Sequence, residues 1–149
     1  MGANLILGGI VITACVAIQC VVVAVLVLAL LVMERRGMVK PSFIRASAVL
    51  AMFTLIMMAG ALVQIAVWAE VFLLRGEFAD FATAFYHSTV NFATLGYGDI
   101  VMSERGRLLG ALEAANGVLM FGLTTGVLYS VFNALLRRVW DARDELFAD

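Results

Sequence analysis

The sequence predicts an all-α membrane protein with three membrane-spanning helices and one short helix that enters the membrane and returns. Hydrophobic residues make up 64% of the 149-residue chain and charged residues only 14%, whereas soluble domains are about 45–50% apolar and about 25% charged. Three long apolar runs are interrupted by one run that is too short to cross a bilayer. The net charge of −1 gives no indication of a nucleic-acid partner.

The first and second runs, residues 4–33 and 46–69, carry no charge. About 20 apolar residues cross a bilayer, so the longer first run is expected to tilt or to protrude. It contains no arginine or lysine and therefore cannot be a charge-carrying voltage sensor. We expect it to pack outside the rest of the molecule and to contribute surface to assembly. Pro41 is placed to begin the second helix, where proline is tolerated.

The short apolar run, residues 81–98, lies between the second run and the third, residues 108–136. Its first part is helical in character over about a dozen residues, too few to cross a bilayer. Asp80 is placed to cap this helix. A short apolar segment between two spans is expected to be re-entrant.

Basic residues set the orientation of the spans. Arg35, Arg36, Lys40 and Arg45 follow the first span, and Arg137 and Arg138 follow the third. An excess of basic residues marks the cytoplasmic side. The N-terminus is therefore expected outside and the C-terminus inside.

The stretch TLGYGD, residues 94–99, follows the re-entrant helix at membrane depth. Non-helical backbone at that depth must be buried in protein or must line a wet path. Gly96 and Gly98 permit positive φ on alternate residues, which turns successive carbonyls the same way. A row of carbonyls can replace the water shell of a cation, and the partly negative end of the preceding helix also favours a cation. Since one chain supplies only one wall, several copies must surround an axis.

TLGYGD resembles the filter signature of potassium channels, with Leu95 at the usual valine position. AFYHSTVNFATLGYGDI is similar to their pore helix and filter, and residues 106–136 are similar to the inner helix of the simple prokaryotic channels. The likeness covers roughly residues 46–138. The chain thus resembles the two-transmembrane pore-loop potassium channels, with one extra N-terminal transmembrane helix.

This resemblance implies a homotetramer with a central pore. The K⁺ ligands it implies are backbone carbonyls of the filter, with the Thr94 hydroxyl as the innermost ligand: Thr94, Leu95, Gly96 and Tyr97, followed by Gly98, where the chain turns out. Asp99 would lie behind the outer mouth, and the Tyr97 side chain would point into the pore helices. No cofactor is expected beyond the permeant K⁺, and the expected partners are three further copies of the chain and membrane lipid.

The resemblance also divides the chain. Residues 1–42 form the extra helix and a basic loop, residues 43–138 the pore domain, and residues 139–149 a short cytoplasmic tail. Within the pore domain the outer helix is residues 43–74, the pore helix and filter residues 80–99, and the inner helix residues 106–138. A short single-pore chain with so little regulatory sequence suggests a prokaryotic inner membrane.

The pore helix departs from the family pattern at positions that support the filter. Tyr86 and His87 replace two common aromatic residues, Ala93 replaces a common threonine, and Val90 occupies a position that is acidic in some members. His87 is the single histidine of the chain. It is either a pH sensor behind the filter or a neutral ring that holds its neighbours in place.

Glu113 is the single acid inside a span. It is expected to point toward the pore helix and to accept hydrogen bonds there, either as a carboxylate or while protonated. An ion-binding or gating role is the alternative. Asn116 and Gln64 are expected to join helices through hydrogen bonds.

Lower on the inner helix, four residues recur at every fourth position: Phe121, Thr125, Tyr129 and Asn133. They form one stripe, which faces either the pore axis, where Tyr129 would narrow the cytoplasmic mouth, or the second helix. Gly117 stands at the hinge position of the family. It permits either bending or close helix packing.

The function expected from these features is passive, K⁺-selective conduction through a tetrameric pore. A less selective cation channel is one alternative, and a non-conducting subunit that keeps the pore fold is another. An enzyme is not expected, because no nucleophile, acid pair or metal cluster is within reach of another.

Overall fold

The computed structural model describes residues 2–36 and 42–146. Lys40 and Pro41, which entered the predictions of orientation and of the second helix, lie outside the described residues. The described chain forms four helices and no strand: α1 (Gly2–Arg35), α2 (Phe43–Leu74), α3 (Phe81–Phe92) and α4 (Arg107–Leu146). The prediction of an all-helical fold is confirmed.

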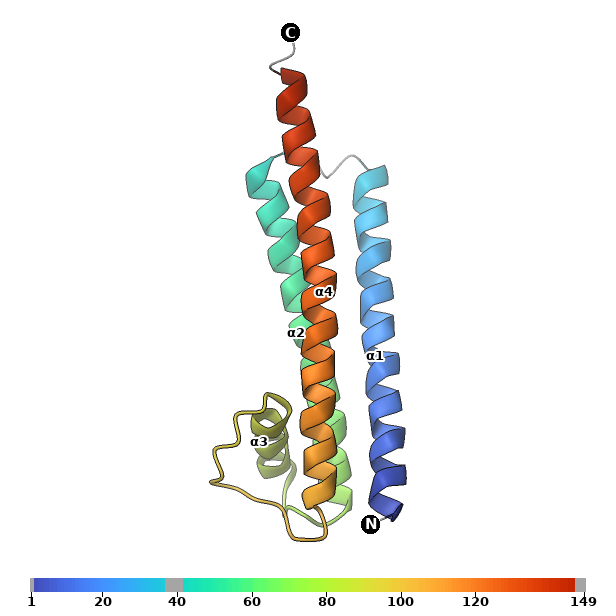
Figure 1. The fold of residues 1–149 in the computed structure, drawn as a ribbon, viewed down its shortest axis with the longest axis vertical. Helices are drawn as coiled ribbons and strands as arrows, with labels where there is room; N and C mark the ends of the chain where they lie inside the picture. The colour runs from blue at the N-terminus through green and yellow to red at the C-terminus, as the bar shows by residue number, and fades with distance from the viewer. Residues whose placement is uncertain (1, 37–41, 147–149) are drawn as a thin grey trace.

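Three of these helices run side by side along the long axis of the molecule, and α3 lies at the end where the chain begins (Figure 1). α1, α2 and residues Arg107–Trp140 of α4 are long and apolar enough to cross a membrane. The 34 residues of α1 extend about 51 Å at about 1.5 Å per residue, against about 30 Å of hydrocarbon core. α4 is continuous through the range expected for the inner helix and into the expected tail.

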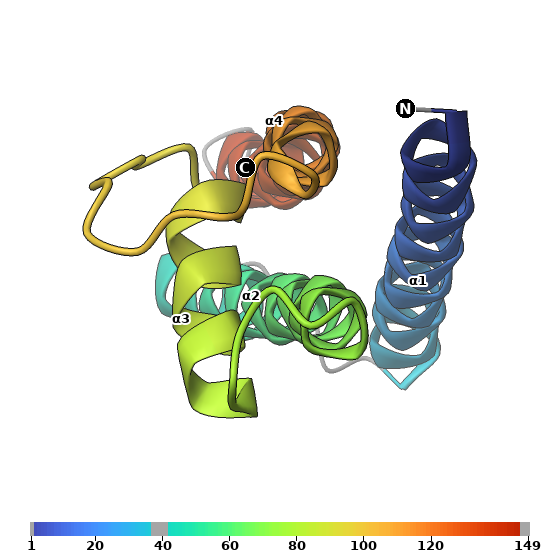
Figure 2. The same cartoon turned by 90° about the horizontal axis from the view of Figure 1, so that it is seen from below.

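α3 has only 12 residues, or about 18 Å, and cannot cross. Asp80 is its N-cap, as predicted: its carboxylate accepts hydrogen bonds from the Thr83 backbone N–H at 2.9 Å and from the Thr83 hydroxyl at 2.8 Å. These bonds, the backbone one first, lower the pKa of Asp80. Seen from below, α3 lies beside α2 and α4, on the side away from α1 (Figure 2).

α1 packs against α2 and α4 of its own chain. Its buried residues recur at intervals of three, four or seven residues and form one stripe: Asn4, Gly8, Val11, Cys15, Gln19 and Leu26. In the middle of this stripe, Gln64 of α2 donates to Gln19 at 2.9 Å, and Gln19 donates to Thr124 of α4 at 3.1 Å. Gln64 therefore joins helices, as predicted.

Both ends of α1 are also held. Asn4 donates to the backbone oxygen of Arg105 at 2.6 Å and accepts from Arg75 at 3.2 Å. At the opposite end, Arg138 of α4 pairs with Glu34. α1 is thus bonded to the rest of the chain at three levels.

Two apolar clusters fill the spaces between the long helices. The cluster at the α3 end is built around Trp68, Phe72, Phe92 and Leu109. The cluster at the other end contains Leu26, Phe53, Met57 and Leu135. The first cluster fixes α3 against α2 and α4, and so sets the position of the segment that follows α3.

Candidate functional site

The segment TLGYGD begins where α3 ends. The backbone N–H of Thr94 donates to Asn91 O at 2.9 Å, and that of Leu95 donates to Val90 O at 2.9 Å. This pair of bonds closes a helix through a residue in the left-handed conformation, and Thr94 has φ of +58°. Glycine usually occupies such a position, and a β-branched residue there is an outlier that costs about 1–3 kcal/mol.

Left-handed residues then alternate along the segment. Gly96 has φ of +58° and Gly98 has φ of +75°, while Leu95 and Tyr97 between them have negative φ. Both glycines therefore have the backbone conformation that the carbonyl scheme requires. The positive φ of Thr94 extends this alternation by one residue toward α3, whereas the sequence predicted positive φ only for Gly96 and Gly98.

The segment stands away from the helices of its own chain (Figure 2). All residues from 94 to 99 are exposed, including 53% of Leu95 and 66% of Tyr97. Irregular backbone at membrane depth is tolerated only when protein covers it or it lines a water-filled path. In one chain, residues 94–99 are covered by no other part of the described protein.

Tyr86 joins α3 to the far end of the segment. Its hydroxyl donates to Asp99 Oδ2 at 2.7 Å. This hydrogen bond lowers the pKa of Asp99 and raises the pKa of Tyr86. Two of the residues expected to support the filter, Tyr86 and Asp99, are therefore bonded to each other.

His87 makes a second connection. Its Nδ1 lies 3.1 Å from the backbone oxygen of Ile100, which only accepts, so Nδ1 carries the hydrogen. The ring packs against Phe72 and Phe78, with centroids 5.8 Å and 4.8 Å away. Burial lowers the pKa of His87. In this arrangement the ring is neutral and holds the chain beyond the filter segment against α3.

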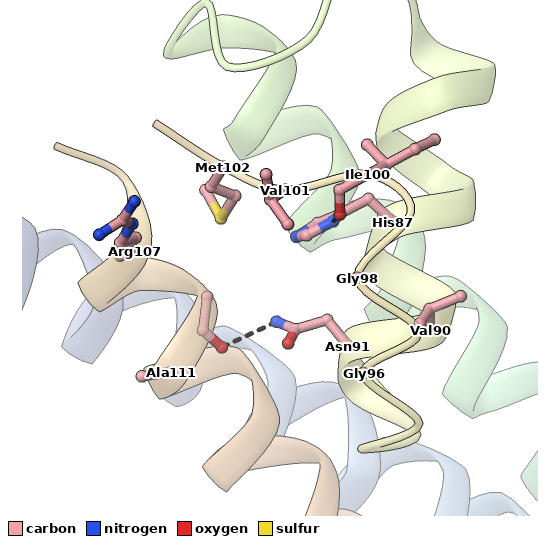
Figure 3. Close-up of a pocket in the computed structure, with 11 residues that line it drawn as sticks. His87, Val90, Asn91, Gly96, Gly98, Ile100, Val101, Met102, Arg107 and Ala111 are labelled. Atoms are coloured by element: carbon pink, nitrogen blue, oxygen red, sulfur yellow. Dashed lines mark hydrogen bonds between the residues drawn. The ribbon is translucent and has the colours of Figure 1, made fainter. Parts of the chain in front are cut away.

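A pocket of about 320 Å³ lies behind the segment (Figure 3). Gly96, Gly98 and Val90 form one wall, and α4 forms the opposite wall from Arg107 to Ala111. Figure 3 shows the Asn91 side chain crossing toward α4, where its Nδ2 donates to Gly110 O at 2.8 Å.

Glu113 of α4 is fully buried and faces α3. Its Oε2 accepts from Asn91 Nδ2 at 2.6 Å, and its Oε1 is hydrogen-bonded to Ser88 Oγ. Ser88 Oγ also lies 3.0 Å from the backbone oxygen of Ile65 in α2. Sequence reasoning did not single out Ser88 and Asn91. They share one face of α3 at positions i and i+3, which was the available signal.

Gly117 lies where α4 packs against Phe92, the last residue of α3. A Cβ added at Gly117 would stand 2.0 Å from Phe92 O and 2.8 Å from Phe92 C, far inside contact distance. Bending and close helix packing were the two roles predicted for Gly117, and the structure shows close packing. The hinge remains a prediction.

The four residues of the α4 stripe, Phe121, Thr125, Tyr129 and Asn133, have different neighbours along the helix. The Phe121 ring meets Phe92 edge-on, with centroids 5.7 Å apart. Further along, Thr125 and Tyr129 border a shallow groove beside Leu50 of α2, and Tyr129 is 65% exposed. Asn133 is half-buried. The lower stripe thus lies at the edge of α2 without being covered by it.

Among residues 2–36 and 42–146, no three His, Cys, Asp or Glu side chains lie close enough to hold a metal ion together.

Two comparisons bear on this arrangement. A family model described as an ion channel matches residues 51–134, more than half of the chain. The matched region begins within α2, includes α3 and the segment TLGYGD, and ends within α4, so α1 lies outside it. No solved structure matches the chain.

Proposed function

The chain belongs to the ion channel family, and from this premise we propose that it forms a K⁺-selective channel that conducts passively. Family membership and three apolar helices make it a multi-pass membrane protein and indicate transport, not enzymatic chemistry. The observation that carries K⁺ selectivity is the alternation of left-handed residues at 94, 96 and 98. This conformation suits a ladder of carbonyls that replaces the hydration shell of K⁺.

The proposal includes a homotetramer. Support comes from the exposure of residues 94–99, which need cover that one chain does not supply. Large apolar side chains on α4 are exposed as well, among them Val118, Leu119 and Leu123. In a tetramer these faces would meet neighbouring copies and lipid. Thr94 to Gly98 would supply the ion ligands, and Asp99, Tyr86, His87 and Val90 would support them.

We propose the orientation with the N-terminus outside and the C-terminus cytoplasmic, in a prokaryotic inner membrane. The basic residues after α1 and near the end of α4 support it, because Arg138 pairs with Glu34, the residue before Arg35 and Arg36, so these positions lie at one end of the bundle. The segment TLGYGD would then open to the outside.

The test is cation flux into proteoliposomes of the purified protein, comparing K⁺ with Na⁺ and adding barium as a blocker. We expect strong preference for K⁺ and block by barium. Equal K⁺ and Na⁺ flux would replace the proposal with a non-selective cation channel. Absence of flux from a verified tetramer, repeated with Tyr129→Ala to open a constriction at the cytoplasmic mouth, would favour a non-conducting subunit.

A further inference from the structure

Glu113 is the one buried acid of the described spans, and no basic side chain compensates it. Neither of the ion pairs among the described residues includes Glu113, and its hydrogen-bond partners are neutral. The titratable group that interacts with it electrostatically is the Cys15 thiol of α1. The groups that α2 and α3 present to this site, the Ile65 carbonyl, Ser88 and Asn91, carry no charge. An ionised carboxylate buried in this way is costly.

The number of hydrogens on each side chain decides which groups donate in the cluster of Glu113, Ser88 and Asn91. The Nδ2 atom of Asn91 carries two hydrogens and has two acceptors, Gly110 O and Glu113 Oε2. A flipped amide would place Oδ1 against Gly110 O, two acceptors facing each other, so the amide orientation is fixed.

The Ser88 hydroxyl has one hydrogen and two oxygen neighbours. The Ile65 carbonyl can only accept, at 3.0 Å. When Ser88 donates to Ile65, the bond between Ser88 and Glu113 needs a hydrogen from the acid. The expected role of Glu113 was to accept hydrogen bonds, as a carboxylate or while protonated; with Ser88 donating to Ile65, its protonated Oε1 is a donor to Ser88.

We propose that Glu113 is a neutral carboxylic acid in the conducting channel and is a positioning residue for the filter. The inference rests on the proposed K⁺ channel function. The acid donates to Ser88, Ser88 donates to Ile65, and one directed chain of hydrogen bonds joins α4 to α3 and α3 to α2. The side chain of Asn91 donates to the other oxygen of Glu113. The backbone oxygen of Asn91 accepts from the N–H of Thr94, the first filter residue.

Ionisation would break this chain at a defined point. A carboxylate needs the Ser88 hydrogen for itself, so Ser88 would turn away from Ile65 and α3 would lose its side-chain bond to α2. The start of the filter would then be less firmly held.

The test compares Glu113→Gln, Glu113→Asp and Glu113→Met in proteoliposomes, with tetramer assembly verified for each. Glutamine keeps one donor and one acceptor and cannot ionise. We expect it to preserve the K⁺/Na⁺ flux ratio within about twofold. Methionine removes every polar atom and should lower the ratio about tenfold, a typical effect of losing buried hydrogen bonds. Aspartic acid is one carbon shorter and should behave like methionine.

A pH series separates positioning from simple packing. As the pH is raised, wild-type selectivity should fall when the acid ionises, while Glu113→Gln, which cannot ionise, should stay flat. Both proteins contain the titratable groups Cys15, His87 and Tyr86. The difference between the two pH profiles therefore reports on Glu113 alone. A flat wild-type profile, or Glu113→Asp retaining selectivity that Glu113→Gln loses, would overturn the proposal.

An infrared difference spectrum of wild type against Glu113→Gln at neutral pH supplies a readout that needs no flux. A protonated-carboxyl C=O band lost in the variant supports the proposal, and a carboxylate band in its place overturns it. A wild type without K⁺ preference would refute the proposed function, while the infrared spectrum would still decide the state of Glu113.

Discussion

Replacing Gly96 with alanine changes one hydrogen to a methyl group at the centre of the filter segment. The new Cβ would have no heavy atom within 4 Å, so steric clash contributes nothing within one chain. The cost is conformational, because Gly96 has φ of +58° and an L-residue in this region is disfavoured by about 1–2 kcal/mol. In the proposed tetramer, four substituted residues together raise the conformational cost to about 4–8 kcal/mol. This cost lowers the population of the alternating backbone by a factor of at least about 10³.

The assay is K⁺ flux together with the oligomeric state of Gly96→Ala. We expect flux to be abolished and assembly to be retained. Gly9→Ala is the matched control, since Gly9 also has no neighbour within 4 Å but lies in an ordinary helix. It should conduct normally. Wild-type K⁺ flux through Gly96→Ala would refute the assignment of the filter.

Three further predictions concern the supports of the site. Gly117→Ala should destabilise the protein by about 3 kcal/mol or more in thermal unfolding, because its Cβ would overlap Phe92 O; an unchanged melting temperature would contradict the close packing. The lowered pKa of His87 means that its contribution to stability is complete above about pH 6.5 and is lost as the pH falls through the folded-state pKa. Thermal melts of wild type should show this acid sensitivity and those of His87→Trp should not, whereas equal profiles would argue against a buried neutral ring. Gln19→Leu removes two interhelical hydrogen bonds worth about 0.6–1.7 kcal/mol each and should lower the melting temperature. The control Thr13→Val should not lower it, because the Thr13 hydroxyl bonds only its own helix. Equal melting temperatures for the two variants would show that the hydrogen bonds of α1 contribute nothing to stability.

Hydropathy predicted the architecture well because the spans differ sharply from their flanks in charge. The number of long helices, the short fourth helix and the Asp80 cap all depend on residues close together in sequence. The left-handed conformations of Gly96 and Gly98 followed from residue type alone. Local signals therefore sufficed for these features.

Sequence reasoning missed two features of the site, one set by local backbone bonds and one by contacts between distant segments. Thr94 is left-handed against its own preference, because backbone bonds at the end of α3 impose that conformation. The contacts of Glu113 with Ser88 and Asn91 join residues 25 and 22 positions apart. Glu113 was expected to face the pore helix, but the register between α3 and α4 depends on long-range packing, so Ser88 and Asn91 were not singled out as its partners.

The packing of α1 was hidden for a related reason. Its buried stripe lies within a run that is apolar on every side, so its periodicity has little contrast. Only Asn4 and Gln19 interrupt the apolar character on that face. Two amides on one side of an otherwise apolar helix were the available signal for the contacts with α2 and α4.

The three levels of bonding along α1 have a consequence for how the protein can be divided. A fragment that begins at α2 would leave Gln64 and Thr124 facing lipid without the Gln19 amide between them, and would free Arg75 and Arg138 from their partners. Each interhelical hydrogen bond lost in this way is worth about 0.6–1.7 kcal/mol. The region that matches the family is therefore expected to be less stable as a separate fragment than in the chain that includes α1.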